Sequence, residues 1–161
     1  MRGALLAALF AVAACQQAEP APPSAAEAQA FLAGNKAQAG VVTTATGLQY
    51  RIVRAGPKDR PTAKEGDEVK VHYEGKLLDG RVFDSSYQQG APAVFTVGQL
   101  VAGWNEALQL MRPGDEMMLW VPPELGYGEE GAPPDIPPNS VLVFRMEMLD
   151  VLPRSGGIGF G

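Results

Sequence analysis

The 161-residue sequence is poor in the residues from which many catalytic and metal-binding sites are built. It contains one cysteine and one histidine, so a disulfide within the chain and a cysteine- and histidine-ligated metal site are both excluded. Basic residues are few as well: 13 lysines and arginines stand against 18 aspartates and glutamates, a formal net charge of −5. Because nucleic-acid binding needs a basic face, no nucleic-acid partner is expected. The sequence also has no pattern of nucleophile and base and no phosphate-binding loop, so we expect neither a metal nor a cofactor.

Hydrophobic residues, glycine and proline are abundant by contrast. With 46% hydrophobic residues the chain can bury a core, and its length corresponds to about one domain of ~100–200 residues. The 19 glycines and 14 prolines are typical of a loop-rich β protein rather than of a helical bundle.

The N-terminus has the features of an export signal. Residues 1–15 read MRGALLAALFAVAAC, and the apolar run is shorter than the ~20 residues that span a bilayer but has the size of a signal-peptide core. Val-Ala-Ala-Cys resembles the bacterial lipobox, in which the cysteine becomes the lipid-modified first residue; an ordinary cleaved signal peptide is the alternative. We therefore predict a signal peptide over 1–14, lipidation at Cys15 and a flexible tether over 15–24.

This reading also predicts a location. The protein would be exported and held at the membrane by its lipid. Gln16 stands where an aspartate retains some lipoproteins on the inner membrane, which favours the periplasmic side of the outer membrane.

A short helix is expected after the tether. Ser24 and Glu27 form the pattern of a capping box, in which each residue satisfies a backbone N–H of the other. The alanine-rich run that follows predicts a helix over Ala25–Ala39, stopped by Gly40. We assign residues 25–46 to this helix and a linker.

The rest of the chain changes to an apolar period of two, which indicates strands. Asp79-Gly80 is the strongest short hairpin signal, because its turn needs positive φ. One helical segment, AGWNEALQLM, interrupts the strands. The sum predicts an α+β fold: a five- or six-stranded antiparallel β-sheet wrapped around one short helix, with the short N-terminal helix added. Residues 47–152 form this domain and 153–161 a Gly-rich tail.

Certain side chains fall on strand faces that should meet solvent. His72 alternates with Val71 and Tyr73, so we expect it on the surface and without a catalytic role. Met118 and Trp120 are apolar on such a face. Either the N-terminal helix covers them or they form a docking patch for a partner, and we favour the helix.

Aromatic residues gather at strand ends, in the helical segment and in loops. One interpretation is the core of a small domain. The other is a ligand pocket, which the acid beside Phe83 favours, because a carboxylate at the rim of an aromatic cluster must be hydrogen-bonded or serve a ligand. The candidate residues are Tyr73, Phe83, Asp84, Phe95, Leu100, Val101, Trp104, Tyr127, Ile136 and Phe144.

The segments VHYEGKLLDGRVFDSS, GQLVAGWNEALQLMRPGDE, VPPELGYGEEG and IPPNSVLVFRMEML resemble the FKBP-type peptidyl-prolyl cis-trans isomerases. The resemblance covers residues 47–151, and the helix before it looks like the approach segment of bacterial exported members. It implies an enzyme that accelerates X–Pro isomerisation during the folding of exported proteins, by binding the twisted amide in an apolar aromatic pocket without covalent or metal chemistry. Its partners would be proline-containing unfolded polypeptides and the macrolide inhibitors of the family.

The resemblance also implies a role for each pocket residue. Trp104 forms the floor. The Tyr127 hydroxyl and the Val101 backbone N–H donate to substrate carbonyls, Asp84 lies beside the twisting bond, and Ile136 contacts the ligand from a loop. Asp84 and Tyr127 are thus the catalytic residues. The substrate-binding residues are Tyr73, Phe83, Phe95, Leu100, Val101, Trp104, Ile136 and Phe144.

The sequence departs from the family pattern around this pocket. Ala93 stands two residues before Phe95, where the family often has an aromatic. Gln89 lies nearest to the position of an arginine that partners the acid in some members, and Ala132 stands where others have a histidine. We expect these changes to alter inhibitor affinity and substrate preference more than the activity.

An alternative function remains compatible with the same fold. A noncatalytic binding module would grip exposed apolar segments without turning over proline bonds. The complete pocket favours the enzyme, because a binder would be expected to have lost some of its residues. The sequence contains no heptad pattern and no long apolar helix, so we expect a monomer.

Overall fold

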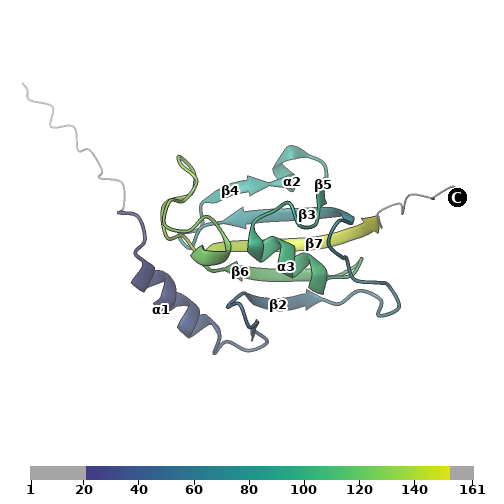
Figure 1. The fold of residues 1–161 in the computed structure, drawn as a ribbon, viewed down its shortest axis with the longest axis horizontal. Coiled ribbons are helices and arrows are strands. Elements are labelled where there is room, and N and C mark those ends of the chain that lie inside the picture. The colour runs from purple at the N-terminus through teal and green to yellow at the C-terminus, as the bar shows by residue number, and fades with distance from the viewer. Residues whose placement is uncertain (1–20, 153–161) are drawn as a thin grey trace, which may run out of the picture.

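The computed structural model describes residues 21–152. The predicted signal peptide, Cys15 and the Gly-rich tail lie outside the described residues. Helix α3 lies across one face of a sheet, and helix α1 lies at the opposite end of the molecule from the end of β7 (Figure 1). The elements are α1 (Ala25–Asn35), β1 (Val42–Thr43), β2 (Gln49–Arg54), β3 (Glu68–Lys76), β4 (Val82–Ser85), α2 (Ser86–Gln89), β5 (Ala93–Thr96), α3 (Ala102–Leu110), β6 (Glu116–Val121), the 3₁₀ helix η1 (Pro123–Leu125) and β7 (Leu142–Leu152).

All strands of the described residues belong to one seven-stranded sheet in which every pair is antiparallel. The order is β1-β2-β6-β7-β3-β4, and β5 pairs with the first half of β3 while β4 pairs with its second half. The long strands β3 and β7 pair along almost their full length, from Glu68↔Leu152 to Lys76↔Val143. The antiparallel α+β architecture is confirmed.

The predicted number of five or six strands was too low. The strand that periodicity missed is β1, which has two residues, both exposed. A segment of this length presents no alternation of buried and exposed side chains, so only its pairing with β2 identifies it. The hairpin at Asp79-Gly80 is confirmed: Gly80 has a φ of 90°, and the Leu77 N–H donates to the Arg81 carbonyl across the turn at 2.9 Å.

The main core lies between the sheet and α3. Alternation along β3 and β7 directs one face of each strand towards the helix, and these side chains are almost completely buried. They include Val69, Val71, Tyr73, Leu142, Phe144, Met146 and Met148, which meet Trp104, Ala107 and Leu108 of α3.

Helix α1 covers part of the other sheet face. Ala28 of the helix packs with Trp120 and Val141, and Met118 lies against this second cluster. Trp120 is only 9% exposed. The expectation that the N-terminal helix covers Met118 and Trp120 is therefore confirmed.

The capping box at the start of α1 is present as predicted, but the helix ends at Asn35 instead of Ala39. The Gln49 side chain on β2 explains this difference. It accepts from Asn35 Nδ2 and donates to the Leu32 carbonyl, both at 2.8 Å. Gly34 and Asn35 are weak helix formers, so these bonds to the sheet are more favourable than another helical turn.

Candidate active site

The aromatic residues enclose a cavity of about 130 Å³ on the α3 side of the sheet. Strands β3, β4, β5 and β7 contribute its walls, α3 its floor, and the segments that precede α3 and follow η1 its mouth. Its lining residues are Tyr73, Phe83, Asp84, Phe95, Leu100, Val101, Trp104, Tyr127 and Phe144. Both sequence interpretations are thus partly right, because Tyr73, Trp104 and Phe144 belong to the core and also line the cavity.

The floor of the cavity is held rigid by ring contacts. Trp104 meets Tyr73, Phe95 and Phe144 edge-on, with centroids 5.0, 5.3 and 5.1 Å apart and interplanar angles of 84°, 89° and 81°. Edge-to-face pairs of this kind add about 0.5–1.5 kcal/mol each beyond the area they bury. The Trp104 Nε1 is buried without a hydrogen-bond partner among the described residues.

Gly75 is a site residue that the pocket prediction did not include. It lies on β3 opposite Phe144, and a Cβ at this position would come within 2.6 Å of Phe83 Cζ and 2.7 Å of Phe144 Cε1. The two rings meet edge-on above it, with centroids 5.5 Å apart. A glycine inside a strand pattern often marks such a close approach. The glycine in the middle of this alternating strand was therefore the feature of the sequence that could have predicted its place in the site.

Asp84 is the charged residue of the cavity wall, and neutral donors occupy both of its oxygens. The Tyr73 hydroxyl donates to Oδ2 at 2.6 Å and Gln89 Nε2 donates to Oδ1 at 3.0 Å. Burial and then the bond to Asp84 raise the pKa of Tyr73 above its ordinary value, so Tyr73 keeps its proton at neutral pH. Gln89 thus contacts Asp84 in the way expected of the arginine that some family members have near this position.

Tyr127 lies at the mouth of the cavity with its side chain 43% exposed. Hydrogen bonds hold its loop on both sides: Gly128 N–H donates to the Pro123 carbonyl at 2.8 Å, and Gly131 N–H donates to the Tyr127 carbonyl at 3.0 Å. Val101 is the N-cap of α3 and has no side-chain cap. Since N–H groups at a helix start lack intrahelical acceptors, this edge of the mouth offers backbone donors.

Ile136 differs from the other predicted site residues, because it does not line the cavity. It is 5% exposed and packs in the main core. An isolated bridge to Ala132 holds it there, with N–H···O distances of 2.8 and 3.0 Å. The loop folds back on itself and turns Ile136 towards the core, which local sequence could not indicate.

His72 lies on the sheet face opposite the cavity, as alternation predicted, but it is half-buried rather than on the surface. Its ring stacks on Tyr87 with centroids 4.6 Å apart, and Nδ1 lies 2.9 Å from Ser86 Oγ. Ser86 Oγ in turn accepts from the Tyr73 N–H at 2.9 Å. His72 therefore supports the strand that carries Tyr73 from behind.

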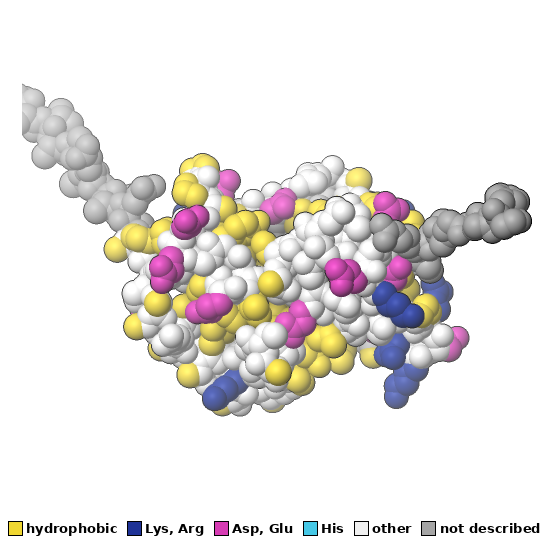
Figure 2. Space-filling view, in the orientation of Figure 1, with side chains coloured by type: hydrophobic (Ala, Val, Ile, Leu, Met, Phe, Trp, Pro, Cys, Tyr) yellow, Lys and Arg dark blue, Asp and Glu magenta, His cyan; other side chains and the backbone are white. Residues whose placement is uncertain are grey.

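Hydrophobic side chains form patches on the face seen in Figure 2, and acidic side chains are scattered among them. Most lysine and arginine side chains visible in this view lie at the right-hand end. The α3 side of the sheet therefore exposes apolar patches and acidic side chains on the same face.

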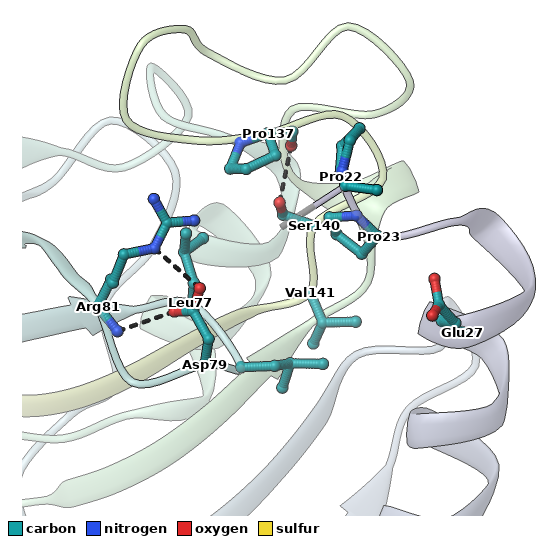
Figure 3. A pocket seen from close by; sticks show the side chains of 11 residues that line it. Pro22, Pro23, Glu27, Leu77, Asp79, Arg81, Pro137, Ser140 and Val141 are labelled. Carbon is teal, nitrogen blue, oxygen red and sulfur yellow. Dashed lines mark hydrogen bonds and ion pairs between the residues drawn. The ribbon is translucent and has the colours of Figure 1, made fainter. Parts of the chain in front are cut away.

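A larger hollow of about 310 Å³ lies between the N-terminal segment, the β3–β4 turn and the chain before β7 (Figure 3). Its polar groups already have partners: Arg81 pairs with Asp79, Glu27 caps α1, and Ser140 Oγ donates to the Pro137 carbonyl at 2.7 Å. The smaller aromatic cavity, which offers unused donors at its mouth, is the better candidate for chemistry.

Residues 60–149 match the protein family described as FKBP-type peptidyl-prolyl cis-trans isomerase. The chain belongs to this family. Residues 3–52 of this FKBP-type chain match a second family, described as the domain amino terminal to the FKBP-type isomerase. Helix α1, which we expected to be only an approach segment, lies within this second match, together with β1 and the first residues of β2.

Among curated proteins, the chain is 48% identical over 128 residues to the peptidyl-prolyl cis-trans isomerase Mip of Coxiella burnetii, which covers 80% of this chain and 55% of the relative. It is 43% identical over 126 residues to the outer membrane protein MIP of Legionella longbeachae, covering 78% and 53%. The crystal structure of FkpA from Escherichia coli is similar with a TM-score of 0.75 at 42% identity, covering 80% and 59%. The FKBP-type chain thus spans little more than half the length of these relatives.

Within residues 21–152, no group of three or more His, Cys, Asp or Glu side chains is placed to hold a metal ion. In the same residues, no helix has the length and apolar character needed to cross a bilayer.

Proposed function

We propose that this protein catalyses the cis–trans isomerisation of X–Pro bonds in exported polypeptides. The observation that carries the proposal is the cavity itself. It combines an apolar aromatic interior of about 130 Å³ with hydrogen-bond donors at its mouth and one carboxylate whose partners are neutral. Membership of the FKBP-type family supports the same activity.

The physical task of such a site is to lower a rotation barrier. Turning an X–Pro bond costs ~18–20 kcal/mol because the amide loses its resonance at the half-way twist. The twisted amide is less charge-separated than the planar one, so an apolar site favours it relative to water. Preferential binding of the twisted form accelerates the reaction without a covalent step.

Each lining residue would have a separate role in binding the twisted amide. The prolyl ring would enter between the Trp104 floor and the walls of Phe83 and Phe144. The Tyr127 hydroxyl and the Val101 N–H would donate to substrate carbonyls, which fixes the chain on either side of the bond. Asp84, held in place by its two donors, would lie beside the twisting amide. No side chain is required to gain or lose a proton.

The location of the protein is part of the same proposal. The sequence pattern at Cys15 supports a lipid anchor on an exported protein, and the Legionella longbeachae relative is named an outer membrane protein. We place the folded domain at the periplasmic side of the outer membrane, as a monomer, with proline-containing unfolded chains as its partners. Macrolide inhibitors would compete for the same cavity.

A peptide isomerisation assay on the purified full-length protein tests the activity. Tyr127→Phe removes one donor, worth about 0.5–1.5 kcal/mol, and should lower kcat/KM about threefold to tenfold. Tyr87→Phe is the matched control, since Tyr87 is similarly exposed at 46% but packs on His72 outside the cavity. Its activity should equal the wild type.

The noncatalytic alternative gives a different result in the same assay. If the folded wild-type protein binds a proline peptide but leaves the uncatalysed rate unchanged, the protein is a binding module and the proposed activity is wrong.

A further inference from the structure

The loop that carries Tyr127 is acidic and contains no basic residue. Residues 113–144 include no lysine or arginine, whereas Glu124, Glu129, Glu130 and Asp135 lie within them and are all exposed. None of the ion pairs within residues 21–152 includes one of these acids. We call residues 123–139 the acidic loop.

The acidic loop is tied to the mouth of the cavity. Glu129 and Glu130 follow Tyr127 by two and three residues, so their Cα atoms lie within about 7 and 11 Å of the Tyr127 Cα. The bond from the Gly131 N–H to the Tyr127 carbonyl, at 3.0 Å, closes this turn. These distances from Tyr127, the proposed donor to a bound peptide, are comparable to the Debye length of about 8–10 Å at physiological salt.

The cavity wall carries a charge of the same sign. Asp84 lines the cavity, and its partners Tyr73 and Gln89 are both neutral. No ion pair within residues 21–152 includes Asp84. Two basic residues of the β3–β4 hairpin pair with other acids: Lys76 with Glu74 at 2.7 Å and Arg81 with Asp79 at 2.8 Å. Figure 2 shows further acidic side chains on the same face of the molecule.

Taken together, these contacts describe an apolar cavity in a negative field. A ligand whose proline fills the cavity must place its neighbouring residues under the acidic loop. Clefts of one charge sign raise the local concentration of oppositely charged ligands and repel those of the same sign.

We propose that the site selects X–Pro segments with a lysine or arginine within a few residues of the proline, and disfavours segments with aspartate or glutamate there. This inference rests on the proposed isomerase activity and adds a substrate class to it. The apolar cavity would recognise the proline, and the acidic loop with Asp84 would recognise the charge beside it.

The test compares matched proline peptides that differ only in flanking residues: lysine, glutamine or glutamate. At an ionic strength of about 0.01 M, where the Debye length is about 30 Å, kcat/KM should be at least about threefold higher for the lysine peptide than for the glutamate peptide. At about 1 M, where the Debye length is about 3 Å, the difference should disappear.

Variants locate the charges responsible. Glu129→Gln/Glu130→Gln should reduce the lysine preference at low salt and leave kcat/KM for the glutamine peptide unchanged. The control Asp59→Asn/Glu68→Gln removes the same charge from exposed positions outside the loop and the cavity, and it should keep the preference.

The outcomes separate this inference from the activity. If the glutamine peptide is not isomerised at all, the proposed function fails. If it is isomerised but lysine and glutamate peptides react equally at low salt, or if both double variants reduce the preference equally, the acidic loop does not select substrates and the inference is overturned.

Discussion

Replacing Gly75 with alanine tests whether the spacing of the cavity rings depends on one missing side chain. A methyl group at this position would lie 2.6 Å from Phe83 Cζ and 2.7 Å from Phe144 Cε1, closer than carbon atoms can approach. Phe144 is 4% exposed and Trp104 packs against it at 5.1 Å, so it cannot move inward. The rings must therefore shift towards the cavity, or the strands must separate.

The cost can be bounded from this geometry. Overpacking of a well-packed core costs about 1–3 kcal/mol, and alanine returns about 0.4–1 kcal/mol by restricting the unfolded chain. We expect Gly75→Ala to lower the free energy of unfolding by about 1–2 kcal/mol. A shift of the Phe83 ring by about 1 Å into a cavity that must fit a prolyl ring should lower kcat/KM by about 10- to 100-fold.

Urea unfolding and the peptide assay measure the two effects separately. Gly34→Ala is the control, because a Cβ there meets no atom within 4 Å and alanine favours the helix by about 0.5–1 kcal/mol. Gly75→Ala combined with Phe83→Leu should recover part of the stability, since one of the two clashing rings is gone while Phe144 remains. A Gly75→Ala protein with wild-type unfolding midpoint and activity would refute the reasoning.

Three further predictions concern titration, the N-terminal helix and the anchor. The raised pKa of Tyr73 means that the neutral tyrosine stabilises the fold, so this contribution to the free energy of unfolding is complete below pH 10 and decreases as the pH rises further. The kcat/KM of both the wild type and His72→Gln should stay constant between about pH 6 and 9. A change of kcat/KM near neutral pH that disappears in His72→Gln would contradict this. Hydrogen bonds from the Ser24 N–H and hydroxyl lower the pKa of Glu27, so their stabilisation of α1 is complete above pH 4.5 and is lost as the pH falls. Amide hydrogen exchange in α1 should accelerate in acid and also in Ser24→Ala, because loss of the N-cap side chain costs about 1 kcal/mol of helix stability. Ser24→Asn should protect the α1 amides as the wild type does. Cys15→Ser should leave an unlipidated precursor that mass spectrometry can identify, and a processed lipoprotein from this variant would exclude Cys15 as the modified residue.

Local chemistry accounts for what could be read from the sequence. The capping box at Ser24 and the turn at Asp79-Gly80 each depend on residues a few positions apart, so their geometry follows from the residues themselves. The alternation along β3 placed Tyr73 towards the cavity and His72 on the opposite face for the same reason. Strand alternation and the family motifs together named ten pocket residues, and nine of them line the cavity.

Contacts between distant segments decided the rest. The end of α1 depends on the Gln49 side chain, the role of Gly75 on rings from β4 and β7, and the burial of His72 on α2. Ile136 turns into the core because its loop bridges back to Ala132. In each case a local conformational preference of a few tenths to ~1 kcal/mol competes with packing or hydrogen bonds from elsewhere in the chain, whose free energies are similar or larger. Only the tertiary structure brings those partners together.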